Sequence, residues 1–121
     1  MQTISGIVQK GQQRGKKLGF PTMNFSLSEY IAEGIYLSHI MIGNTHYNAL
    51  TFIGAAKTFD ETVYQAETYV FDFHEDVYGQ SVTVSLLKKL RDNQKFESEE
   101  KLIRQMEEDK KQAEIFFKTL T

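Results

Sequence analysis

Hydrophobic and polar residues alternate in short runs over the first ninety positions, a pattern typical of β-strands. Glycine, asparagine or aspartate separates most of these runs, as expected of turns. Gly43 and Asn44 lie between two runs and predict a tight hairpin. Strands on consecutive hairpins predict an antiparallel barrel, because closing so small a sheet removes its exposed edges. The predicted strands are residues 3–8, 34–42, 47–55, 63–73 and 81–90.

From Ser98 onward the hydrophobic period changes to that of an amphipathic helix. Ser98 is a suitable N-cap, and Glu99 and Glu100 suit the positive end of the helix dipole. We therefore expect a helix over about 98–119, packed against a barrel of about 1–92 and carrying no chemistry of its own. The hydrophobic positions of its stripe are Leu102, Met106, Ala113, Phe116 and Leu120.

A chain of 121 residues is long enough for one domain with a hydrophobic core and too short for two ordinary domains, so we expect one domain over 1–121. Its 40% hydrophobic and 25% charged residues are typical of a globular protein, and no apolar run is long enough to span a membrane. The first residues lack the regions of a secretory signal. The absence of cysteine excludes disulfides and thiolate chemistry. These observations agree with a cytoplasmic location.

Positive charge gathers in one short stretch of a chain whose net charge is −2. Residues 10–17 contain cationic residues and no acid, whereas residues 97–114 mix both signs. A local basic loop on an acidic protein favours a small anionic ligand over a long polyanion, so we do not expect nucleic acid as a partner. The cations are Lys10, Arg14, Lys16 and Lys17.

The same basic stretch is rich in glycine. Gly6, Gly11, Gly15 and Gly19 allow close backbone approaches, and backbone N–H groups at the surface can cradle phosphate. The stretch is not a Walker loop, because only three residues separate Gly11 from Gly15 and no hydroxyl residue follows Lys16. It is therefore a candidate phosphate site of another type.

The single proline of the chain, Pro21, directs the backbone out of this loop. It fixes its own φ and restricts Phe20 to an extended conformation. Thr22 and Asn24 are two residues apart, so in an extended segment their side-chain oxygens project to the same side. Two neutral oxygens are too few to bind Mg²⁺ alone, but the ion also takes waters and the phosphate oxygens of a nucleotide. For a lone Pro-Thr-x-Asn a simple turn is the commoner explanation, and the upstream glycines and cations shift the interpretation toward a site.

The predicted strand over 63–73 places a carboxylate among aromatic side chains. Its alternation puts Glu67 on one face with Tyr69, Phe71 and Phe73. Partly apolar surroundings should move the pKa of Glu67 toward the range useful to a general base. On the strand pattern alone, a glutamate at the mouth of the barrel, solvated or paired with a lysine, is favoured. Both interpretations stay open at this point.

Four segments together resemble the riboflavin kinase family, including the C-terminal module of bacterial bifunctional riboflavin kinase/FAD synthetase. They read GIVQKGQQRGKKLGFPTMN, EGIY, AETYVFDFHEDVYG and LRDNQKF, in the family's order and spacing over nearly the whole chain. The resemblance implies a mainly β fold, a six-stranded antiparallel Greek-key barrel with a C-terminal α-helix packed on it. It also implies an enzyme that transfers the γ-phosphoryl group of ATP to the ribityl 5′-hydroxyl of riboflavin, yielding FMN and ADP.

The resemblance further implies a role for each matching residue. Glu67 would be the catalytic group that takes the proton from the attacking hydroxyl. Thr22 and Asn24 would bind Mg²⁺ and the nucleotide. The other nucleotide-binding positions would be Gly11, Arg14, Gly15, Lys17, Val70, Asp72 and Tyr78. The flavin-binding positions would be Arg91, Gln94 and Phe96.

This chain departs from the family's pattern at two positions. Family members usually have alanine where Met23 stands, and bacterial relatives often carry proline where Lys57 stands. The change at Lys57 keeps an alternative open, a flavin- or nucleotide-binding regulatory barrel without catalysis. A barrel that binds single-stranded nucleic acid is a further alternative, disfavoured because the basic residues are confined to one loop. As a partner, the resemblance implies an N-terminal FAD synthetase (adenylyltransferase) domain in a longer protein.

Overall fold

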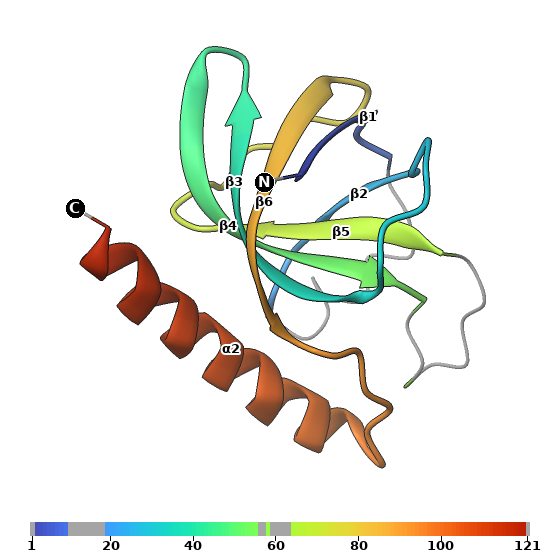
Figure 1. The fold of residues 1–121 in the computed structure, drawn as a ribbon, viewed down its shortest axis with the longest axis vertical. Helices are drawn as coiled ribbons and strands as arrows, with labels where there is room; N and C mark the ends of the chain where they lie inside the picture. The colour runs from blue at the N-terminus through green and yellow to red at the C-terminus, as the bar shows by residue number, and fades with distance from the viewer. Residues whose placement is uncertain (1, 10–18, 56–57, 59–63, 121) are drawn as a thin grey trace.

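The structure, a computed structural model, describes residues 2–9, 19–55, 58 and 64–120. Within these residues the strands form one curled antiparallel sheet, and a long C-terminal helix runs below it (Figure 1). The elements are β1 (Gln2–Ile7), β2 (Met23–Phe25), β3 (Gly34–Ile42), β4 (Thr45–Gly54), β5 (Gln65–Val70), β6 (Ser81–Arg91) and α2 (Glu99–Thr119).

The strand order in the sheet is β1-β6-β3-β4-β5-β2. Strands β3, β4 and β5 are successive neighbours, and β2, which precedes them, lies beside β5, which is a Greek-key arrangement. The two edges of the sheet meet where the Gln9 N–H donates to the Asn24 carbonyl at 2.7 Å. The predicted mainly β barrel with a C-terminal helix is therefore confirmed. The prediction of consecutive hairpins throughout is wrong, since β1, β2 and β6 pair with strands distant in sequence.

The turn between β3 and β4 and the end of β5 show how local sequence controls strand length. Gly43 has a φ of 62° and closes the predicted hairpin, with Ile42 opposite Thr45. Strand β5 ends at Val70, because Asp72 has a φ of 57° that no strand accommodates. The chain therefore turns three residues earlier than the predicted strand over 63–73.

Side chains from the two faces of the sheet form two hydrophobic clusters. Successive strand residues point to opposite faces, so β3 and β4 contribute to both clusters. The inner core fills the barrel and is formed mainly by Ile4, Val8, Met23, Phe25, Ile31, Ile40, Ile42, Ala49, Ile53, Ala66, Val70, Val77, Val82, Val84 and Leu86. The outer cluster lies between the barrel and α2 and consists of Ile35, Leu37, Leu50, Ala113 and Phe117, with partly buried Phe52, Tyr69, Phe71, Leu87, Leu90 and Phe116.

A chain of buried hydroxyl groups crosses the barrel interior. Ser38 of β3 lies 2.8 Å from the hydroxyl of Thr51 in β4, which lies 3.0 Å from that of Thr68 in β5. All three side chains are fully buried, so each group needs these partners to avoid the cost of an unmade hydrogen bond. Because Thr68 follows Glu67, this chain of bonds fixes the register of β5 beside a residue of the candidate site.

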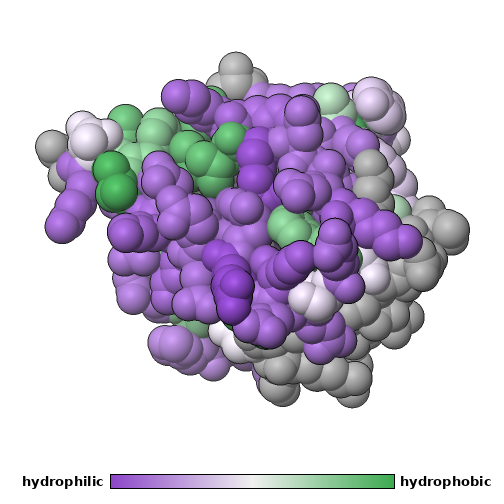
Figure 2. Space-filling view, turned by 90° about the horizontal axis from the view of Figure 1, so that it is seen from below, coloured by the Kyte–Doolittle hydropathy of each residue, from purple (hydrophilic) through white to green (hydrophobic). Residues whose placement is uncertain are grey.

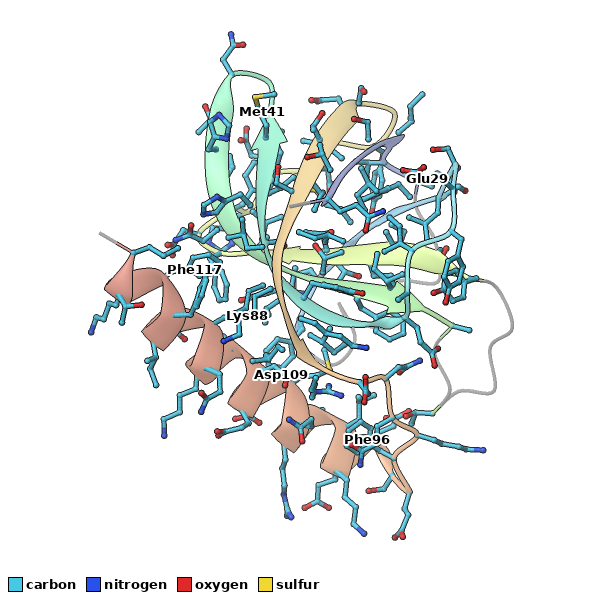
Figure 3. The ribbon with its side chains drawn as sticks, viewed as in Figure 1. Glu29, Met41, Lys88, Phe96, Asp109 and Phe117 are labelled. Atoms are coloured by element: carbon cyan, nitrogen blue, oxygen red, sulfur yellow. The ribbon has the colours of Figure 1, made fainter. Side chains whose placement is uncertain are left out.

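Helix α2 begins after Ser98, whose side chain accepts the Lys101 N–H at 3.2 Å, as the sequence predicts. Its buried side carries Asp109, Ala113 and Phe117, and Figure 3 shows Asp109 and Phe117 on the side that faces the barrel. Leu120, predicted in the hydrophobic stripe, is 56% exposed, and the prediction is wrong because the helix ends before it. The surface seen from below, where α2 lies, is mostly hydrophilic (Figure 2).

No helix in the described part of the chain is long and apolar enough to cross a membrane.

Candidate active site

Glu67 lies in the middle of β5, between a hydrophobic neighbour and a polar one. Its cross-strand partners are Phe52 in β4 and Asn24 in β2. Its partly buried side chain faces away from the inner core, on the same face as Tyr69 and Phe71. The sequence also predicted Phe73 on this face. That residue instead packs against the inner core, because the chain turns after β5.

Thr22, the residue just before the neighbouring strand β2, contacts Glu67. Its hydroxyl Oγ1 donates to Oε1 of Glu67 at 3.5 Å, the long end of hydrogen-bonding distance. Met23 and Phe25 point into the inner core, so Thr22 and Asn24 lie on the opposite face of β2, beside Glu67. Residues distant in sequence thus bring a hydroxyl, an amide and a carboxylate together.

Asn24 is the most buried member of this group, with 2% of its surface exposed. Among the described residues, its side-chain oxygen Oδ1 has no hydrogen-bond partner. A buried polar atom of this kind costs free energy unless a ligand or water satisfies it. The orphaned oxygen is therefore the strongest structural indication of a ligand at this place.

The residues before β2 fix the direction from which the chain reaches the site. Gly19 has a φ of 90°, a conformation that favours glycine. The Phe20 ring packs edge-on against Tyr69 at 5.6 Å between ring centroids. Pro21 itself is exposed, and its role in directing the backbone toward Thr22 stays a prediction.

The predicted phosphate-binding residues fall in residues 10–18, outside the described residues. Of the described residues that flank this segment, Gln9 pairs with Asn24, and Gly19 precedes the Phe20 that contacts Tyr69. Gln9 and Phe20 therefore lie next to residues of the candidate strands, Gln9 beside Asn24 and Phe20 beside Tyr69. The assignments of Gly11, Arg14, Gly15 and Lys17 stay predictions, as does the effect of Lys57.

The other predicted nucleotide-binding residues lie at the end of β5 and in the segment that leads to β6. Val70 ends β5 with its side chain in the inner core, and Asp72 is exposed in the turn that follows. Tyr78 is 45% exposed in a turn held to the strand that leads to the site, since the Gly79 N–H donates to the Val8 carbonyl at 2.8 Å. The roles of these three positions toward a nucleotide stay predictions.

The predicted flavin-binding residues form a second group, at the end of β6 and in the segment that follows (Figure 3). The guanidinium of Arg91 lies 5.7 Å from the ring centroid of Phe96. The Phe96 N–H donates to Thr58 Oγ1 at 3.1 Å, which anchors the segment to the chain after β4. Gln94 is exposed.

One row of cross-strand neighbours connects the two groups. Arg91 of β6 pairs with Ile35 of β3, which pairs with Phe52 of β4, and Phe52 pairs with Glu67. Asn24 then continues the row on β2. Because paired residues point to the same face, the row places Arg91 and Glu67 on either side of two apolar side chains. Neighbouring strands are about 4.8 Å apart, so the backbones of the two charged residues are separated by three strand spacings, roughly 14 Å along the sheet.

Asp109 belongs to the second group, and the sequence-based interpretation missed it. It is 5% exposed and binds both Nε and Nη2 of Arg91 at 2.8 Å. A signal was present, because the hydrophobic stripe skips from Met106 to Ala113 and Asp109 occupies the helical position between them. Among the described residues, no group of three or more His, Cys, Asp or Glu is arranged to hold a metal ion.

Sequence comparison identifies relatives over nearly the whole chain. The model of the flavokinase family, described as riboflavin kinase, matches residues 1–117. The bifunctional riboflavin kinase/FMN adenylyltransferase of Bacillus subtilis is 35% identical, over 97% of this chain and 39% of its own length. The trifunctional protein RibF/MnmA of Mycoplasmoides gallisepticum is 39% identical, over 94% of this chain and 18% of its own length. The chain thus spans less than half the length of these curated relatives.

Solved structures show the same fold. A Streptococcus pneumoniae protein titled a macrolide-efflux protein matches with a TM-score of 0.82 and 34% identity, over 93% of this chain and 38% of its own. The riboflavin kinase of Trypanosoma brucei matches with a TM-score of 0.65 and 20% identity, over 96% of this chain and 79% of its own, which supports the fold alone. With a family match that covers 117 of its 121 residues, the chain belongs to the flavokinase family, the riboflavin kinases.

Proposed function

We propose that this chain is an ATP-dependent riboflavin kinase, which transfers the γ-phosphoryl group of ATP to the ribityl 5′-hydroxyl of riboflavin. Family membership supports the reaction. The observation that carries the proposal is the group of Thr22, Asn24 and Glu67, in which a carboxylate lies beside a buried amide oxygen without a partner among the described residues. Phosphoryl transfer needs mainly positioning and charge neutralisation, with a base for the attacking hydroxyl.

The donor atoms of this group fit the Mg²⁺ that accompanies ATP. Asn24 Oδ1 is a neutral hard oxygen, and the Thr22 hydroxyl keeps lone pairs while it donates to Glu67. Mg²⁺ in nucleotide sites takes few protein ligands and completes its shell with waters and phosphate oxygens. Thr22 and Asn24 would hold the ion, which when bound neutralises charge on the phosphates.

Glu67 would act as the general base. The hydroxyl oxygen of riboflavin forms a bond to the γ-phosphorus, the bond from that phosphorus to the bridging oxygen of ADP breaks, and the hydroxyl proton passes to Glu67. The hydrogen bond from Thr22 orients the carboxylate for this step. Such a base typically contributes about 10²- to 10⁴-fold in rate.

The row across the sheet supports an elongated substrate. Between Glu67 and Arg91, Phe52 is partly exposed and Ile35 is buried in the outer cluster against α2, and Phe96 lies beside the guanidinium. We place the reacting hydroxyl at the Glu67 end and the flavin ring toward Arg91, because an aromatic ring packs well on apolar and cationic neighbours.

The remaining sequence-based roles are part of the same proposal. Gly11, Arg14, Gly15 and Lys17 would bind the ATP phosphates, with Asp72 and Tyr78 near the nucleotide. Val70 would contribute through its backbone, since its side chain is in the inner core. The names of the bifunctional relatives support an adenylyltransferase region in a longer protein. Use of ATP agrees with a cytoplasmic location.

The direct test is incubation of the purified chain with riboflavin and Mg²⁺-ATP, with FMN and ADP quantified by chromatography. We expect the two products in equal amounts, and none when Mg²⁺ is chelated. Riboflavin binding without FMN formation would instead indicate a regulatory flavin-binding barrel. Binding of single-stranded RNA without flavin binding would indicate the nucleic-acid alternative.

A further inference from the structure

A bidentate ion pair joins the end of β6 to helix α2. Arg91 donates through Nε to Oδ1 of Asp109 and through Nη2 to Oδ2, both at 2.8 Å. The side chains of Arg91 and Asp109 are only 19% and 7% exposed. Gln105, one turn earlier on α2, donates to the same Oδ1 at 3.0 Å. The carboxylate is therefore fixed by three hydrogen bonds and holds the guanidinium in one orientation.

The orientation of the guanidinium determines which of its donors remain for a ligand. A guanidinium carries five N–H groups in a fixed plane. Two of these groups, one on Nε and one on Nη2, donate to Asp109. A third, on Nη1, donates to the Asp92 carbonyl at 3.1 Å. Among the described residues, the two other N–H groups, one on each terminal nitrogen, have no assigned acceptor. The one on Nη2 points to the end of the fork, because the other Nη2 hydrogen faces Asp109, and it can donate to an acceptor atom of a ligand.

We propose that Asp109 is a positioning residue for riboflavin, which acts through Arg91 and does not touch the substrate. The inference rests on the proposed function, in which the flavin ring lies toward Arg91. Asp109 holds Nε and one hydrogen of Nη2, so that the remaining donors of the guanidinium are presented to the polar edge of the flavin in one orientation. Since the donors are already ordered, binding does not have to immobilise a long side chain, which favours affinity.

The contacts of Arg91 extend this effect to the neighbouring segment. The guanidinium lies over Phe96, and the Phe96 N–H is tied to Thr58. Loss of the Asp109 contact would release the guanidinium and, with it, one support of the Phe96 ring. Helix α2 is then part of the riboflavin site, although the sequence predicted a helix without chemistry.

The test is the variant Asp109→Asn, which keeps the size of the side chain and removes its charge. Riboflavin affinity is measured by flavin fluorescence without ATP, and Mg²⁺-ATP affinity is measured separately. We expect riboflavin to bind about tenfold more weakly, as for the loss of one charge-assisted contact, with Mg²⁺-ATP affinity within about twofold. Glu100→Gln, which breaks the exposed pair with Arg104 on the same helix, is the matched control and should change neither affinity.

A double-mutant cycle separates positioning from a purely structural role. If Asp109 acts through Arg91, Asp109→Asn should add no further loss of riboflavin affinity in an Arg91→Met background. Additive losses, or equal losses of riboflavin and ATP affinity, would mean that Asp109 only stabilises the fold. Should Asp109→Asn fail to fold, Gln105→Ala frees the carboxylate more mildly and should weaken riboflavin binding in the same direction. Unchanged riboflavin affinity in a folded variant overturns the proposal.

This readout also separates the positioning role from the proposed function. Because riboflavin binding is measured without ATP, a chain that makes no FMN but loses riboflavin affinity on Asp109→Asn would retain the positioning role and lose the kinase assignment. If the chain makes FMN but wild type and Asp109→Asn bind riboflavin equally, the kinase assignment is retained and the positioning role is lost. A wild-type chain that binds no riboflavin would overturn both.

Discussion

The two ends of one row across the sheet are built in opposite ways. At one end, Thr22 makes a long 3.5 Å bond to Glu67, and Asn24 Oδ1 has no partner among the described residues. At the other end, Arg91 and Asp109 satisfy each other through two bonds of 2.8 Å. The first arrangement leaves Asn24 Oδ1 unsatisfied among the described residues, and the second uses its polar atoms to join the barrel to the helix.

The polar groups at one end of the row therefore serve mainly ligand binding and catalysis, whereas those at the other end also stabilise the fold. A polar group that gains its partner only when a ligand binds contributes little to the free energy of folding. Substitution of such a group should therefore impair binding or catalysis and leave stability nearly unchanged. Substitution of one of two buried groups that satisfy each other should lower stability, because removal of one leaves an uncompensated charge. At Asp109 we expect this loss of stability in addition to the weaker riboflavin binding proposed above. Substitutions at the two ends of the row test this contrast.

The largest effect is expected from Asp109→Ala, which leaves the Arg91 guanidinium buried without its partner. We expect the free energy of unfolding to fall by about 3–5 kcal/mol, measured by urea denaturation. The double variant Arg91→Met with Asp109→Leu should recover much of this loss, since both charges are then gone. A single variant as stable as wild type would remove this contact from the set that joins α2 to the barrel.

Glu67→Gln should impair the reaction more than any substitution that leaves stability intact. We expect the turnover number to fall at least about 100-fold, while riboflavin and Mg²⁺-ATP still bind, because the amide cannot accept the hydroxyl proton. The measurement is steady-state FMN formation together with binding of each substrate. Glu75→Gln, in an exposed position after β5, is the matched control. Near-normal turnover would exclude Glu67 as the base.

Asn24→Ala tests the orphaned oxygen. We expect the Mg²⁺ concentration needed for half-maximal activity to rise at least about tenfold, as for the loss of a metal contact. The free energy of unfolding should change by less than about 1 kcal/mol, because an unsatisfied buried polar atom is removed with the side chain. Asn48→Ala, an exposed asparagine of β4, should leave both quantities unchanged. An unaltered Mg²⁺ dependence in Asn24→Ala would contradict the metal assignment.

Tyr64 provides a comparison with a residue that is in neither group of the row. Burial, with the neighbouring Tyr30 next in importance, raises the pKa of Tyr64 to about 12, and its hydroxyl donates to the Ile31 carbonyl. A raised tyrosine pKa stabilises the folded state below the unfolded value near 10, and this contribution is lost as the pH rises toward 12.

We therefore expect wild type to lose more stability between pH 10 and pH 12 than Tyr64→Phe does, measured by the unfolding midpoint. FMN formation at neutral pH should be the same in both proteins. Equal alkaline losses would show that the Tyr64 hydroxyl does not carry this pH dependence.

Local sequence features predicted much of the fold. Ser98 and the acidic residues after it identified the start of α2, and Gly43 with Asn44 identified the hairpin. The length of β5 was overestimated, because a pattern of alternation does not reveal the positive φ at Asp72. Strand order was also beyond prediction from local patterns, since β1 and β6 pair across a separation of about eighty residues and many pairings satisfy the same alternation.

The candidate site shows the same division. Strand alternation by itself determined that Thr22 and Asn24 share a face and that Glu67 shares one with Tyr69, because side-chain direction depends only on near neighbours in the chain. Only the tertiary structure decided that Asn24 lies opposite Glu67 and that Arg91 pairs with Asp109. The register between distant strands depends on how the sheet curls. Which carboxylate of α2 meets Arg91 depends on where the helix packs. Local hydrophobic periodicity contains no information on either.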